Sequence, residues 1–83
     1  MKRHSHNFVD TYDGLVGFGA DRDTDENTVF YYLQKFSDDL LMKTLLKRLS
    51  EDELSEIFNL LTRLLKVHLT DTEYHDLFLK EES

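Results

Sequence analysis

The sequence predicts an all-α protein, a small bundle of four helices preceded by an irregular N-terminal arm. Three observations carry this prediction. The 83 residues include fifteen leucines and no proline, a composition that favours helices. From residue 27 onward, apolar side chains recur three and four positions apart, which places them on one face of a helix. Capping signals divide this pattern into helices at about residues 27–36, 38–49, 51–69 and 71–80.

The arm, residues 1–26, differs in composition from the helical domain at residues 27–83. All three glycines lie in the arm, and its apolar residues follow no sustained helical period. The arm nevertheless contains six large apolar side chains, which favour its docking on a protein surface over its being a free linker. We expect the glycines to allow tight turns that lay three of these side chains on the helices; they are Leu15, Val16 and Phe18.

The first two predicted helices are short and amphipathic. On the first, at 27–36, the inward face consists of Val29, Tyr32, Leu33 and Phe36. On its other side, we expect Phe30 and Tyr31 to hold the arm through Phe8 or Phe18. The N-terminus of this first helix is assigned to Asp25, Glu26 and Asn27. Ser37 is read as the N-cap of the second helix, which has two aspartates in its first turn and two basic residues in its last.

Two complete capping boxes begin the remaining helices. The first box is Ser50-Glu51-Asp52-Glu53. Its serine hydroxyl can accept a hydrogen bond from the backbone amide of Glu53, and the glutamate carboxylate can accept one from the backbone amide of Ser50. Thr70-Asp71-Thr72-Glu73 repeats the pattern. The longest predicted helix therefore runs from Glu51 to about Leu69, and the last helix follows at 71–80.

The two central helices carry more apolar surface than one narrow stripe. The long helix has a main stripe whose spacing is that of a buried face, and Leu60 and Val67 lie beside it. The stripe comprises Leu54, Ile57, Phe58, Leu61, Leu64, Leu65 and His68. The second helix has six apolar residues in ten positions. A chain of this size buries only about 60% of its unfolded surface. We therefore expect a homodimer or another protein partner, with the following residues at the interface: Leu41, Leu45, Leu60, Leu64 and Val67. The alternative is that the other helices and the arm cover this surface.

Composition excludes several classes of protein. The chain has no cysteine, which excludes disulfides, thiolate nucleophiles and cysteine-based metal centres. No apolar run reaches membrane-spanning length, and the first residues lack the apolar core of a signal peptide. We therefore expect a cytoplasmic protein with no membrane partner. No spacing of serine, histidine or carboxylate residues sets a nucleophile beside a base, so neither an enzyme nor a cofactor is predicted.

Asp21-x-Asp23-x-Asp25 is the nearest approach to a metal signature. Alternating carboxylates resemble the first half of a calcium-binding loop. The sixth position of such a loop needs glycine and is Glu26 here, while the twelfth needs glutamate and is Tyr32. The alternative interpretation is an acidic lead-in to the first helix. Metal binding through Asp21, Asp23 and Asp25 remains an alternative hypothesis.

Nucleic-acid binding is a further alternative, because the second and third helices outline a helix-turn-helix. Lys43, Lys47 and Arg48 supply positive charge, but the helix in the recognition position begins with three carboxylates. The formal net charge of −7 opposes phosphate binding. The inverse hypothesis, an acidic mimic of nucleic acid, has solubility as its simpler explanation.

Overall fold

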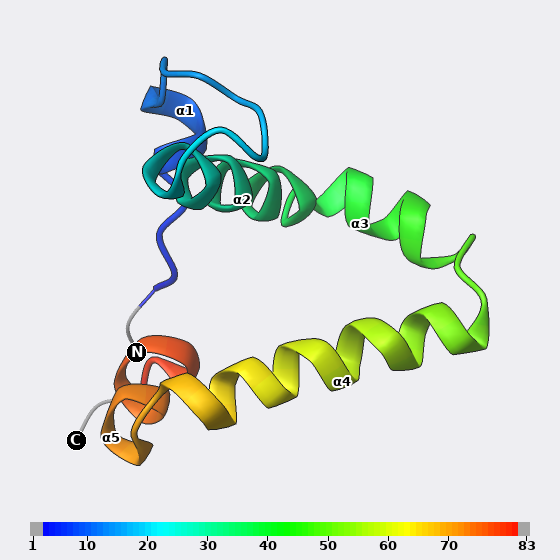
Figure 1. The fold of residues 1–83 in the computed structure, drawn as a ribbon. Coiled ribbons are helices and arrows are strands. Elements are labelled where there is room, and N and C mark those ends of the chain that lie inside the picture. The colour runs from blue at the N-terminus through cyan, green and yellow to red at the C-terminus, as the bar shows by residue number, and fades with distance from the viewer. Residues whose placement is uncertain (1–2, 82–83) are drawn as a thin grey trace. The chain divides into compact units, whose positions relative to one another are not determined.

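The computed structural model describes residues 3–81, and every regular element in them is helical (Figure 1). The all-α prediction is therefore confirmed. Residues 5–47 form one compact unit, and residues 48–81 belong to a second. The elements, in chain order, are α1 (Phe8–Thr11), α2 (Arg22–Phe36), α3 (Asp39–Leu46), α4 (Glu51–His68), α5 (Asp71–Glu73) and a π-helical turn (Tyr74–Leu79).

Within residues 5–47 the N-terminal arm docks on α2 through aromatic rings. The rings of Phe8 and Phe30 are stacked, with centroids 4.0 Å apart and planes 10° apart. Tyr12 and Tyr31 form a tilted pair with centroids 6.0 Å apart. These contacts confirm that Phe30 and Tyr31 hold the arm, and they identify Phe8 rather than Phe18 as the ring that Phe30 contacts.

A hydrogen-bonded contact fixes the glycine-containing loop to the middle of α2. Thr28 is the only buried residue of the described chain, at 6% exposure. Its hydroxyl donates to the carbonyl of Gly17 (3.1 Å) and accepts from the amide of the same residue (3.0 Å). Leu15 and Phe18 remain 77% and 76% exposed. The glycines therefore do not bury these two side chains against the helices: backbone groups make the hydrogen-bonded contact, and Phe18 only borders a hollow along α2.

Helix α2 begins five residues earlier than the sequence pattern indicates. Asp21 is its N-cap, and the carboxylate accepts from the amide of Thr24 (2.8 Å) and from its hydroxyl (3.0 Å). Asp25 lies inside the helix, where it accepts from the amide of Gly19 (2.7 Å). Gly19 has a φ of +103°, which an L side chain rarely adopts. This turn in the loop allows the helix to start at Arg22.

Helix α3 starts one residue later than predicted and ends earlier. Asp38 is its N-cap, accepting from the amide of Leu41 (3.0 Å). Ser37, which the sequence suggests as the cap, instead ends α2 and donates its hydroxyl to the carbonyl of Gln34 (2.7 Å). A serine followed by an aspartate offers two adequate caps, so the tertiary course of the chain decides between them.

In residues 48–81 both predicted capping boxes are formed. Ser50 Oγ accepts from the amide of Glu53 (3.1 Å), and the glutamate accepts from the amide of Ser50 (2.8 Å). Thr70 and Glu73 make the same reciprocal pair at 3.1 and 2.8 Å. Between the two boxes, α4 runs as one unbroken helix of 18 residues (Figure 1).

The last helix departs from α-geometry. Only Asp71–Glu73 is α-helical, and Tyr74–Leu79 forms a wider π-helical turn. Lys80, at φ 59°, closes the turn in the left-handed region. His75 contacts the carboxylate of Glu81, which lies beyond that turn, rather than Asp71 one helical turn earlier.

Apolar burial is shallow throughout residues 3–81. No apolar side chain reaches the burial of Thr28, and large apolar side chains are exposed on α2, α3, α4 and the π-helical turn. A small chain that leaves this much apolar area in contact with water retains a driving force for association.

Candidate functional site

The largest candidate surface is one side of α4. Apolar positions recur along the helix at spacings of three and four and cover about half of its circumference at 100° per residue. The polar side is formed by residues such as Asn59 and Lys66. We call the apolar side the α4 apolar face, and it comprises Leu54, Ile57, Phe58, Leu60, Leu61, Leu64, Leu65 and Val67.

The α4 apolar face is open to solvent. Leu60 is 45% exposed, Val67 is 64% exposed, and of the eight residues only Leu65 is not classed as exposed. The three α4 residues that the sequence predicts at an interface therefore share one face. No polar side chain interrupts this face between Leu54 and Val67, although Glu53 and His68 lie on the same side of α4 at its two ends.

The other two predicted interface residues lie on α3. Leu41 is exposed and Leu45 is partly buried. They belong to the compact unit of residues 5–47, whereas α4 belongs to the other unit. The chain thus carries this predicted surface in two parts, one on each unit.

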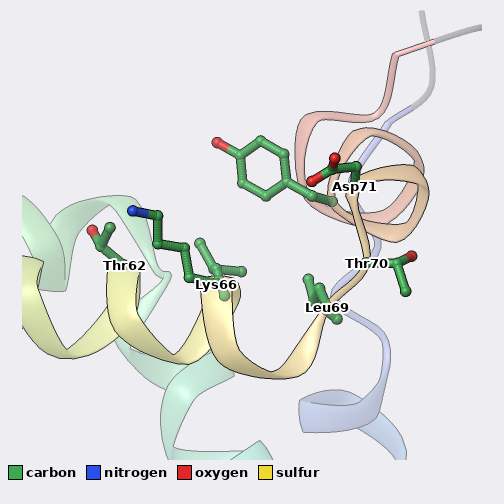
Figure 2. Close-up of a pocket in the computed structure, with 7 residues that line it drawn as sticks. Thr62, Lys66, Leu69, Thr70 and Asp71 are labelled. Carbon is green, nitrogen blue, oxygen red and sulfur yellow. The ribbon is translucent and has the colours of Figure 1, made fainter.

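A shallow pocket lies where α4 meets α5. It has a volume of about 310 Å³ and is bordered on the α4 side by Thr62 and Lys66 and at the turn by Leu69, Thr70 and Asp71 (Figure 2). All four polar side chains among these residues are exposed. Tyr74, which also lines the pocket, is partly buried, but none of these four polar side chains is held in a buried position to orient a small ligand.

A second apolar hollow lies along α2, with a volume of about 360 Å³. Its walls combine the inward-facing positions of α2 with Phe18 of the arm. Periodicity predicts the α2 positions as core, but the structure leaves them exposed. The α2 residues that line the hollow are Thr28, Val29, Tyr32, Leu33 and Phe36.

The three aspartates of the calcium-like pattern do not act together. Asp21 caps α2, and Asp25 accepts from the loop at Gly19. Within residues 3–81 no three histidine, aspartate or glutamate side chains are grouped to hold a metal ion. The hydrogen bonds from Thr24, led by its backbone amide, lower the pKa of the Asp21 carboxyl below its ordinary value of 3.8. The carboxylates at 21 and 25 thus organise the start of a helix.

The pKa of Asp21 makes the start of α2 sensitive to acid. A carboxyl whose pKa is lowered by folding stabilises the folded state above its ordinary pKa of 3.8, and this contribution disappears as the pH falls through the lower folded value. We expect Asp21→Ala to lower the melting temperature at pH 7, with the difference from wild type shrinking at pH 3 and below. Asp21→Asn keeps a capping oxygen without a titrating group. Thermal unfolding followed by circular dichroism at both pH values measures this, and an unchanged difference between wild type and Asp21→Ala would contradict it.

The helices of the helix-turn-helix outline fall in different compact units. Lys43 and Lys47 lie in residues 5–47, while α4, with its three acidic residues in the first turn, lies in the other unit. In the part of the chain that the structure describes, no helix has the length and apolar character needed to cross a lipid bilayer.

Comparison with known proteins identifies no relative of this chain. No protein-family model matches the sequence, and neither do any curated protein or any solved structure. The functional argument therefore rests on the surfaces described above.

Proposed function

We propose that this protein is a small acidic interaction module that associates through the α4 apolar face, with a second copy of the chain as its partner. One observation carries the proposal: the longest helix of the protein, closed at its N-terminus by a complete capping box, exposes apolar side chains along its whole length. The capping box sets where the helix begins, whereas the exposed face has no structural role within α4 itself.

The energetics of burial favour association through this face. Covering a leucine contributes roughly 1.5–3 kcal/mol when its side chain leaves water completely. The leucines of α4 are already about half covered, so each contributes part of that amount. In a two-fold dimer every such contribution occurs twice, because the same patch is used by both copies. Together they exceed the lower estimates of the cost of association, about 4 kcal/mol.

Charge repulsion between copies is a modest opposing effect. Each chain carries a formal charge of −7. At physiological ionic strength, charges separated by more than about 8 Å are largely screened. The α4 apolar face carries no charge between Leu54 and Val67, so close approach brings apolar groups together first.

The mass of the intact protein in solution tests the proposal. Sedimentation equilibrium from micromolar to millimolar concentration, in buffer of physiological ionic strength, is expected to show a species of twice the 9.9 kDa chain mass. Its population should rise with protein concentration. A mass of one chain across the whole range would contradict the proposal and favour coverage of the α4 apolar face within a single chain.

A further inference from the structure

Charge is divided between the two halves of α4. Residues 51–59 carry four acidic side chains and no basic one, and residues 60–68 carry Arg63, Lys66 and His68 and no acidic one. Charges in the first and last turns complement the dipole of their own helix. The dipole effect is confined to the first and last turns, and Glu56 and Arg63 lie outside both. The helix dipole therefore does not account for these two residues.

Glu56 and Arg63 lie along the same edge of the α4 apolar face. They are seven positions apart, so they project in nearly the same direction, beside Leu60 and Val67. Their separation along the helix axis is about 10 Å, too far for an ion pair within one helix. Both side chains are exposed and can reach a neighbouring molecule.

The positions of these two residues are self-complementary only in one orientation. When two copies of α4 run antiparallel about a two-fold axis at residues 59–60, Glu56 of each copy lies beside Arg63 of the other. The same register pairs Leu54 with the partner's Leu65 and Phe58 with the partner's Leu61. In a parallel two-fold pair the corresponding edges of the two copies lie on opposite sides of the pair, so Glu56 and Arg63 would form no ion pair with their copies. One antiparallel register thus satisfies the charges and the apolar layers together.

We infer that the second copy docks antiparallel on the α4 apolar face, with two Glu56–Arg63 ion pairs selecting the orientation and the register. This inference rests on the proposed function, because it specifies how the proposed dimer is arranged. The charge complementarity of the two halves of α4 is what identifies another α4 as the occupant. Antiparallel pairing also sets the helix dipoles in opposition, which is favourable.

Charge reversal at both positions tests the orientation. Glu56→Arg alone places two arginines together at each pair, and Arg63→Glu alone places two glutamates together. Each variant is expected to dimerise about tenfold more weakly than wild type, since two exposed ion pairs become two repulsions. An equimolar mixture of the two variants restores both attractive pairs, so heterodimers should form with wild-type affinity. Sedimentation gives the affinities, and native mass spectrometry distinguishes heterodimers from homodimers.

A matched control separates orientation from net charge. Lys66→Glu changes the net charge by the same amount as Arg63→Glu but lies on the polar side of α4, so it should leave dimerisation within about twofold of wild type. If wild type dimerises but the mixture is no tighter than the single variants, the antiparallel arrangement is wrong and the interaction module remains. If wild type shows no association at any concentration, both proposals are wrong.

Discussion

Replacing Leu60 with glutamate is expected to weaken self-association by about a thousandfold or more. Leu60 is near the middle of α4 along its length and level with the inferred two-fold axis, so both copies of the substitution fall in one small region. Because Leu60 is 45% exposed, each copy loses about 1 kcal/mol of burial, and desolvating each new carboxylate costs at least about 1 kcal/mol more, which amounts to about 4 kcal/mol for the dimer. Because each 1.4 kcal/mol is tenfold in the dissociation constant, the expected change is about three orders of magnitude. Sedimentation equilibrium measures it directly.

Asn59→Glu is the matched control for this substitution. It adds the same charge one position away, on the polar side of α4, and should leave the dissociation constant nearly unchanged. Val67→Glu lies on the α4 apolar face near its end and should also weaken association, by less than Leu60→Glu. Circular dichroism checks that all three variants keep their helices. If Leu60→Glu retains wild-type affinity while remaining helical, the α4 apolar face is not the interface.

Replacing Phe30 with alanine is expected to release the N-terminal arm from α2. The Phe8–Phe30 stack is the closest aromatic contact of the described chain, and Phe30 is 47% exposed. Losing half of the burial of one ring and its stacking partner should cost about 1–2 kcal/mol. The amide of Val9, which donates to Gln34 Oε1 (2.9 Å), should then exchange its hydrogen about tenfold faster. Hydrogen exchange followed by NMR provides the measurement.

Phe18→Ala provides the comparison for the arm. Phe18 is in the same segment but is 76% exposed and makes no aromatic pair in the described residues. Its replacement should leave the exchange rate of the Val9 amide unchanged. If the Val9 amide exchanges its hydrogen no faster in Phe30→Ala than in Phe18→Ala, the stack on α2 is not what holds the arm.

The helices that the sequence locates most accurately are those with complete local signals. At Ser50 and Thr70, both partners of each capping box lie within four residues, so the interaction is formed without help from distant parts of the chain. The amphipathic character of α4 follows from its spacing alone, but the stripe that this spacing predicts as buried is exposed in the structure. The prediction for α4 differs from the structure by a single residue at its C-terminal end.

The helix starts that the sequence misplaces are those with several competing caps. Asp21, Asp23, Asp25 and Asn27 are all adequate N-caps, so local preference cannot choose among them. The choice of Asp21 depends on Gly17 and Gly19, whose amides bond to side chains eleven and six positions further along the chain, respectively. Likewise, α1 has four residues and no periodicity to detect, and its position depends on the ring stack with α2.

For this protein the sequence by itself determined the helical class, both capping boxes, the amphipathic character of α4 and the aromatic residues of α2 that hold the arm. Only the tertiary structure decided where α2 starts, which ring of the arm Phe30 contacts and that Leu15 and Phe18 remain in solvent. Caps and helical periodicity act over three or four residues and can be read along the chain. Loop contacts join residues far apart in sequence, and their geometry depends on backbone angles that composition does not specify.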